Sequence, residues 1–183
     1  IIEDGRVRTV SLCISPERTE ARYDKIHLFD VQVNDAVGGY QESKYFEPGT
    51  DVVVAKTPFG NIGLMVCYDL RFPELALSLR QRGANILTAP AAFTYTTGEM
   101  HWQLLLQARA MDTQCQVLGS AQQGWHGQKR QTWGHTTATH SRGHVLAHID
   151  TEGAGLITIP FDLAEQAQIR QSMPLMQHRV LVN

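Results

Sequence analysis

Cys67 is the residue of this chain best suited to covalent chemistry. It ends the segment GNIGLMVC, in which apolar residues alternate as in a β-strand, and Pro73 soon afterwards suits the first position of a helix. A thiol near a helix N-terminus feels the positive end of the helix dipole, which favours the nucleophilic thiolate. This position predicts a cysteine nucleophile that attacks a carbonyl carbon. A cysteine in an apolar run is also typical of a buried core residue, so that alternative stays open.

Histidines offer a competing site. His135, His140, His144 and His148 fall within fourteen positions, so a metal site or a cysteine–histidine pair is conceivable. No paired ligand motif accompanies them, and His140 and His144 flank an expected turn as cross-strand neighbours. The spacing therefore favours exposed hairpin histidines, and we predict no metal. Cys13 and Cys115 lie in apolar β-like runs and are expected to be inert core thiols.

The elements that must position Cys67 follow from hydrophobic periodicity and turn residues. Strands are expected near 10–14, 52–57, 61–67, 84–89, 115–122, 132–139, 144–149 and 154–159. Helices are expected over 73–82, 98–113 and 163–171, the second with Leu104, Ala108 and Met111 on one face. Turns are expected at Gly60 with Asn61, at 141–143, and at Glu152 with Gly153. Strands alternate with helices in the early part of the chain and form hairpins in the late part. This pattern predicts an α/β fold with a mixed sheet covered by helices.

Composition sets broad limits. The chain has 183 residues, 43% hydrophobic content and a formal net charge of −2, which predicts one globular domain and gives no argument for a nucleic-acid or membrane partner. No apolar run approaches 18 residues. Three scattered cysteines do not suggest a disulfide framework, so we expect a reducing, cytoplasmic location.

Four ordered blocks resemble a known family. They are RYDKIHLFD (22–30), QESKYFEPG (41–49), CYDLRFPE (67–74) and APAAFTYTTGEMHWQLLLQARAMDTQ (89–114). This series is similar to the carbon–nitrogen hydrolases of the nitrilase superfamily, closest to the Nit branch of ω-amidase-like and deaminated-glutathione-amidase-like enzymes. The resemblance runs from about Arg22 to Arg179 and implies an αββα layered sandwich, commonly paired into a homodimer.

The resemblance also implies roles for particular residues. Cys67 would form a thioester with a small amide, while Lys25 and the backbone N–H of Tyr68 would stabilise the oxyanion. Glu42 would hold the lysine and position the substrate. An isolated lysine or loop glutamate is ordinarily a solvated surface residue, so both assignments depend on the matching blocks.

The substrate is narrowed by two features. Tyr68 and Asp69 follow the nucleophile where true nitrilases have Trp-Glu, so amide hydrolysis is favoured over nitrile hydrolysis. The later block implies Phe93, Thr94 and Glu99 as pocket residues, whereas Trp102 and its neighbour His101 are as readily explained by packing at the helix start. Deaminated glutathione or a short α-keto acid ω-amide is the implied substrate, and no cofactor is implied.

One catalytic group of the family has no counterpart here. Its members place a glutamate before the block that matches Tyr23 to Asp30, and none of Glu3, Glu17 or Glu20 lies in a matching motif. Because the chain opens with Ile1, we expect further sequence upstream, so residues 1–183 would be a single hydrolase domain lacking its N-terminal strand–helix portion. The 183 residues alone are then expected to be inactive. The alternative is a noncatalytic homologue or fragment that serves as a dimerising or binding domain.

Two further expectations concern local structure. The charges of Asp69, Arg71 and Glu74 are expected to pair behind the nucleophile and hold its turn. The Nit branch usually has an Asp-Pro-Trp-Gly-like turn where this chain has His140, Ser141, Arg142 and Gly143, a departure that affects the loop and not the nucleophile.

Overall fold

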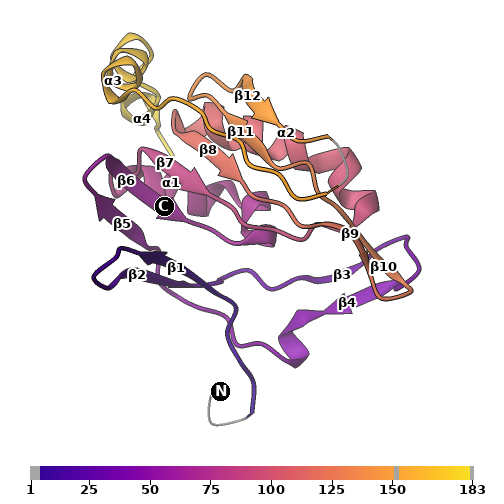
Figure 1. Cartoon of the computed structure of the whole chain (residues 1–183). Coiled ribbons are helices and arrows are strands. Elements are labelled where there is room, and N and C mark those ends of the chain that lie inside the picture. The colour runs from indigo at the N-terminus through magenta and orange to yellow at the C-terminus, as the bar shows by residue number, and fades with distance from the viewer. Residues whose placement is uncertain (1–4, 151–152, 182–183) are drawn as a thin grey trace.

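A six-stranded sheet lies at the centre of the computed structural model, which describes residues 5–150 and 153–181 (Figure 1). The strand order is β12-β11-β8-β7-β6-β5. Strands β6, β7 and β8 are parallel, and the outer pairs are antiparallel. The bounds are β5 (Val54–Thr57), β6 (Gly60–Leu64), β7 (Ile86–Thr88), β8 (Gln116–Gly119), β11 (Thr137–Thr139) and β12 (Val145–His148).

Helices cover this sheet and give the layered α/β architecture that the alternation predicted. Helix α1 (Pro73–Gln81) contacts β6, and α2 (Tyr95–Thr113) contacts β8 and β11. Helices α3 (Leu163–Ser172) and α4 (Leu175–His178) follow β12 and lie at one end of the molecule (Figure 1). Within the described part of the chain no helix is long and apolar enough to cross a membrane.

Three two-stranded sheets and two short 3-10 turns complete the fold. The hairpins pair β1 (Val10–Ile14) with β2 (Thr19–Asp24), β3 (Asp30–Gln32) with β4 (Gly39–Gln41), and β9 (Gln123–His126) with β10 (Arg130–Trp133). The 3-10 turns are η1 (Glu42–Lys44) and η2 (Cys67–Arg71). The hairpins β3–β4 and β9–β10 lie near one another in Figure 1, and residues of both line the same cavity.

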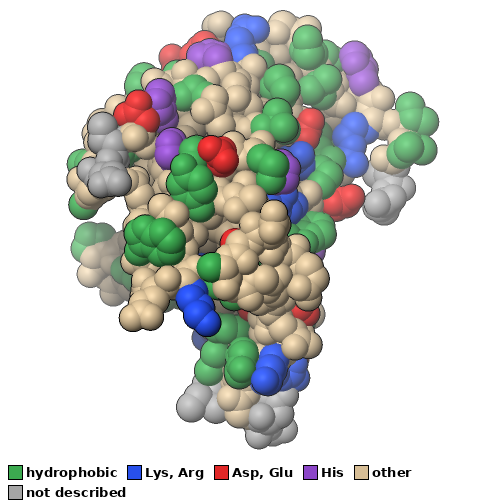
Figure 2. All heavy atoms as spheres, turned by 90° about the vertical axis from the view of Figure 1, so that its right-hand side faces the viewer, with side chains coloured by type: hydrophobic (Ala, Val, Ile, Leu, Met, Phe, Trp, Pro, Cys, Tyr) green, Lys and Arg blue, Asp and Glu red, His purple; other side chains and the backbone are tan. Residues whose placement is uncertain are grey.

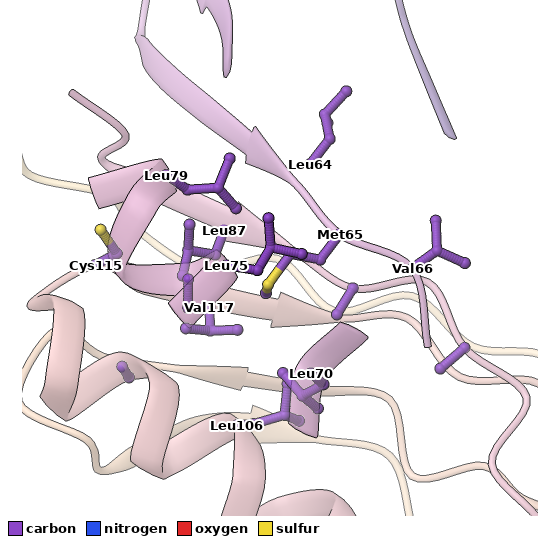
Figure 3. Packing of buried hydrophobic residues seen from close by; sticks show 14 of the residues in the cluster. Leu64, Met65, Val66, Leu70, Leu75, Leu79, Leu87, Leu106, Cys115 and Val117 are labelled. Atoms are coloured by element: carbon purple, nitrogen blue, oxygen red, sulfur yellow. The ribbon is translucent and has the colours of Figure 1, made fainter. Parts of the chain in front are cut away.

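The core forms between the parallel strands and the two covering helices. Leu64, Leu87 and Val117 come from the strands and pack with Leu75 and Leu79 of α1 (Figure 3). All five are at most 4% exposed, and burying each such side chain contributes about 1.5–3 kcal/mol. This packing fixes the sheet against α1, and therefore fixes the connection from β6 to α1 that carries Cys67.

Helix boundaries agree with the local signals except at the start of α2. Helix α1 begins at Pro73 as expected and is followed by Gly83 at φ 92°, a conformation that favours glycine. Helix α2 begins at Tyr95 rather than Gly98, because the side chain of Thr94 accepts a hydrogen bond from the backbone N–H of Thr97 and caps the helix.

The face shared by Leu104, Ala108 and Met111 is not the buried one, and the strand expected at 154–159 is wrong. The face of α2 that contains Leu104 and Met111 points outward, with these residues 65% and 52% exposed, whereas Trp102, Leu106 and Ala110 make the buried face. Helix α2 has apolar residues on both its exposed and its buried face, so its hydrophobic periodicity does not identify which face is buried. Residues 154–159 alternate like a strand but form none, because no neighbouring strand pairs with them among the described residues.

The structure also locates the expected turns and the charged surface residues. The turn at 141–143 is confirmed by hydrogen bonds from His140 N to His144 O and from Gly143 N to His140 O. The turn expected at Gly60 with Asn61 is wrong, because both residues begin β6 and the turn falls at 58–59. Glu152 of the third expected turn lies outside the described residues. Lys and Arg side chains are interspersed with Asp and Glu on the face shown in Figure 2.

Candidate active site

Cys67 opens the 3-10 turn η2, three residues beyond the end of β6. Its φ is 51°, a left-handed conformation that is uncommon for a residue with a side chain and that clusters at functional sites. The backbone N–H of Cys67 donates to the carbonyl of Pro90 (2.9 Å), which follows β7. The cysteine is therefore held at the carboxyl end of two neighbouring parallel strands.

Asp69 anchors this turn from behind. Its fully buried carboxylate accepts hydrogen bonds from Tyr23 Oη (2.7 Å), Val66 N (2.9 Å) and the backbone and ring nitrogens of His27 (3.0 and 2.8 Å). Val66 precedes the nucleophile, whereas Tyr23 and His27 flank Lys25. One carboxylate thus ties the lysine-bearing segment to the cysteine turn.

The expected mutual pairing of Asp69, Arg71 and Glu74 is wrong. Arg71 contacts the ring of His101 (Nη1 to Nδ1, 3.3 Å) and lies over the ring of Phe93, while Glu74 is exposed in the first turn of α1. The partners that Asp69 does use are more than 40 residues away in sequence, apart from Val66. A motif of adjacent charges does not reveal such partners.

Burial raises the pKa of the Cys67 thiol above its ordinary value. A backbone hydrogen bond from Ala92 and the positive charge of Lys25 act in the opposite direction but do not outweigh burial. The expectation of a thiolate favoured by the helix dipole is therefore wrong, because Cys67 lies in η2 and not at the start of α1. A group that accepts the thiol proton is needed for efficient attack.

Lys25 and Glu42 form a buried ion pair beside this thiol. Lys25 follows β2 and is 4% exposed, and its Nζ contacts Oε2 of Glu42, which opens η1 after β4. Glu42 Oε2 also accepts from Phe29 N (2.6 Å), and Oε1 accepts from Thr9 Oγ1 (3.4 Å). Both carboxylate oxygens of Glu42 are thus occupied by donors.

These three side chains line one cavity of about 770 Å³. Its wall combines the cysteine turn, residues of β4 and η1, the segment after β7, and the start of β10. The lining residues include Phe29, Tyr40, Tyr45, Phe46, Tyr68, Phe93, Thr94, Thr97, Gln122 and Arg130. A volume of this size, with six aromatic residues and few charged groups in its wall, is typical of a small-molecule site.

Three of the four other residues expected at the site line this cavity. Tyr68, Phe93 and Thr94 are in the wall, although the Thr94 side chain is also used to cap α2. Glu99 is exposed and does not line the cavity. Because α2 begins three residues earlier than expected, Glu99 faces outward and Thr97 lines the cavity instead.

The sequence reasoning missed Arg130, Tyr40 and Gln122. Tyr40 lies between two of the matching blocks, and Gln122 and Arg130 lie beyond the last block, so no local signal identifies them. Among the described residues that line the cavity, Glu42 is the single carboxylate. Glu17 and Glu20 lie near the turn of the β1–β2 hairpin with Ser15 and Arg18 as partners, and Glu3 lies outside the described residues.

The four candidate histidines of residues 135–148 and the other two cysteines do not line this cavity. His140 and His144 stack across their turn with ring centroids 4.5 Å apart, and His140 Nε2 is 3.4 Å from Glu165. Within residues 5–150 and 153–181, no three His, Cys, Asp or Glu side chains form a metal-binding group. Cys115 is buried as expected, whereas Cys13 is only half-buried because it lies in β1, which contributes no residue to the core.

The chain belongs to the carbon–nitrogen hydrolase family, whose pattern it matches over residues 3–171. Its fold and Nit-branch relatives place it in the nitrilase superfamily. It is 46% identical over 164 residues to a deaminated glutathione amidase of Yersinia enterocolitica, covering 90% of this chain and 57% of that relative.

Two solved structures agree with this assignment. The C. elegans NitFhit protein has a TM-score of 0.88 and 39% identity, covering 96% of this chain and 43% of that one. Saccharomyces cerevisiae Nit3, a member of branch 10 of the nitrilase superfamily, has a TM-score of 0.77 and 30% identity, covering 90% and 56%. The chain therefore spans about half the length of the relatives it matches.

Proposed function

We propose that this chain carries the thiol site of an amidase that hydrolyses the carbon–nitrogen bond of a small carboxylate-bearing amide. Deaminated glutathione or an α-keto acid ω-amide is the proposed substrate type. The observation that carries the proposal is the placement of Cys67, Lys25 and Glu42 around one cavity. The name and 46% identity of the Yersinia relative support the same chemistry.

The reaction proceeds through a thioester on Cys67. The sulfur attacks the amide carbonyl, and the carbonyl oxygen becomes an oxyanion that Lys25 and the backbone N–H of Tyr68 stabilise. The carbon–nitrogen bond then breaks and a thioester remains; after taking a proton, the nitrogen leaves as ammonia from a primary ω-amide or as an amine from deaminated glutathione. Water cleaves the thioester, which yields the carboxylic acid and restores the thiol.

Glu42 acts as a positioning residue for Lys25 rather than as the general base. Its oxygens accept from Lys25, Phe29 and Thr9, and these three donors hold the carboxylate against Lys25. The raised pKa of Cys67 makes that proton transfer necessary. We propose that a second carboxylate, from sequence that precedes these 183 residues in the whole protein, performs this transfer.

The proposal includes a homodimer in a reducing, cytoplasmic environment. Met100, Leu104 and Met111 are each more than half exposed along one face of α2, an apolar stripe that a second copy would cover. The three cysteines are free, which supports a reducing compartment. The alternative of a noncatalytic binding domain has less support, because it gives no role to the buried lysine beside the thiol.

Ammonia release tests the proposed function. The 183-residue chain, an N-terminally longer polypeptide and the Cys67→Ala form of the latter are assayed on glutaramate and related linear amides. We expect release only from the longer polypeptide with Cys67, because loss of a general acid–base costs about 10²- to 10⁴-fold in rate. Full activity of the 183-residue chain would remove the need for a second carboxylate. Equal activity of the Cys67→Ala form would reject the thiol mechanism.

A further inference from the structure

Arg130 is the second cation of the cavity and has no place in the mechanism above. It opens β10 and lines the same cavity as Cys67, and its Nη2 donates to the carbonyl of Ala92 (3.2 Å). Its Nε is buried without a hydrogen-bond partner. A buried guanidinium donor without an acceptor is costly, and because Arg130 lines the cavity, an acceptor atom of a bound ligand can complete it.

The charge of Arg130 is not neutralised by a close carboxylate. Glu42 is paired with Lys25, the other cation in the cavity wall. Asp35 feels the charge of Arg130, but its oxygens accept from Val37 N (2.9 Å), Gly38 N (2.8 Å) and Tyr40 Oη (2.8 Å). Among the described residues, no ion pair joins Asp35 to Arg130. Arg130 is therefore a cation in the cavity wall without a direct ion-pair partner among the described residues, although the nearby carboxylate of Asp35 interacts with its charge.

Ala92 sets the distance between this charge and the nucleophile. Its backbone N–H interacts with the sulfur of Cys67, and its carbonyl accepts from Arg130. One residue spans at most about 3.6 Å and each hydrogen bond adds roughly 3 Å, so the sulfur and the guanidinium lie within roughly 10 Å. A short linear molecule can reach both groups at once.

We infer that Arg130 binds the free carboxylate of the substrate and thereby selects linear monoamides of short dicarboxylic acids. Guanidinium groups bind carboxylates with two parallel hydrogen bonds, which fixes orientation as well as charge. With the carboxylate on Arg130, the amide carbonyl at the other end of the molecule lies at Cys67. This inference rests on the proposed function for the identity of the reacting group, but the binding role of Arg130 is tested without turnover.

The test measures protection of Cys67 from alkylation by iodoacetamide, followed by peptide mass spectrometry. The protecting probes are glutaramate, which has one carboxylate, and glutaramide, its neutral diamide of the same length. The chains compared are the unchanged protein, Arg130→Gln, Arg130→Lys and the matched control Lys129→Gln. Lys129 is the exposed neighbour of Arg130 and does not line the cavity.

We expect glutaramate to protect Cys67 in the unchanged chain and in Lys129→Gln at about one-tenth or less of the concentration needed in Arg130→Gln. That ratio is the usual effect of losing a charge-assisted hydrogen bond. Arg130→Lys should lie between them, and glutaramide should protect all four chains equally weakly. Equal protection by glutaramate in the unchanged chain and Arg130→Gln, or no protection in any chain, would overturn the inference.

Two outcomes separate the inference from the proposed function. If protection depends on Arg130 but no protein form releases ammonia, the carboxylate site stands and the amidase proposal fails. If ammonia is released but Arg130→Gln changes neither protection nor the preference for the acid over the diamide, the amidase stands and the inference fails. Should Arg130→Gln not fold, the acid-to-diamide ratio of the unchanged chain and of Arg130→Lys decides: equal ratios near one reject the inference.

Discussion

Replacing Asp69 by alanine should destabilise the protein more than any change in the cavity wall. The carboxylate is fully buried and accepts four hydrogen bonds, from Tyr23, Val66 and two nitrogens of His27. Alanine leaves these buried donors without their acceptor. Breaking a buried charged network of this kind costs about 3–5 kcal/mol, a large part of the 5–15 kcal/mol that stabilises an ordinary domain.

Asparagine at position 69 should cost less, about 1–3 kcal/mol, for a reason that can be worked out from the contacts. Oδ1 faces the N–H and ring of His27, and Oδ2 faces Tyr23 Oη and the N–H of Val66. The asparagine NH₂ must replace one of these oxygens. The tyrosine hydroxyl or the imidazole can change to an acceptor, but the backbone N–H beside it cannot. In either orientation one buried backbone donor is left facing another donor.

Urea unfolding followed by tryptophan fluorescence measures both variants. Asp150→Ala is the matched control, because Asp150 is an exposed aspartate whose contact with His148 is a surface pair (3.7 Å) worth at most about 1 kcal/mol. The expected order of stability is the unchanged chain and Asp150→Ala, then Asp69→Asn, then Asp69→Ala. A loss below about 1 kcal/mol for Asp69→Ala would refute the view that this carboxylate holds the cysteine turn.

Three further predictions concern the thiol, the lysine and the surface of α2. Because burial raises the pKa of Cys67, its alkylation rate should be slow at pH 7 and should still rise above pH ~8.5, where an unperturbed thiol is half ionised; a plateau below that pH would contradict the shift. In the N-terminally longer polypeptide that we propose to be active, Lys25→Met should lower amide hydrolysis by about 10²- to 10³-fold in steady-state assays, the usual cost of losing an oxyanion donor. The double change Leu104→Glu and Met111→Glu should turn a dimer into a monomer in light scattering, whereas Leu163→Glu on α3 should not; a dimer that survives the double change would place the interface elsewhere.

The sequence predicts the parts of the fold that depend on local signals. Pro73 starts α1, Gly83 follows its end, and the apolar segment before Cys67 contains β6. The start of α2 is missed because Thr94 caps it, and a single threonine four residues before Gly98 is a weaker signal than glycine itself. The exposure of Leu104 and Met111 could not be predicted, because an apolar helix face is as typical of a subunit interface as of the core.

The candidate site is predictable only where its residues lie in recognisable blocks. Cys67, Lys25 and Glu42 are found because each has a matching neighbourhood, and the structure brings all three to one cavity. Glu99 is misplaced by the shifted start of α2. Arg130 is absent from the sequence-based expectation, because its importance depends on an unsatisfied Nε and on the fold that brings β10 to the cavity.

The conformation of Cys67 shows why non-local contacts decide the chemistry. Its left-handed φ of 51° costs of order 1–3 kcal/mol and persists only because the surroundings hold it. The carbonyl of Pro90, which follows β7, accepts the backbone N–H of Cys67. Asp69 accepts the N–H of Val66, the residue before Cys67, and also binds Tyr23 and His27 on either side of Lys25. The same contacts that enforce the turn therefore set the lysine against the thiol. A change that relaxes the turn should accordingly move both groups together, which links the stability loss of Asp69 variants to loss of the site.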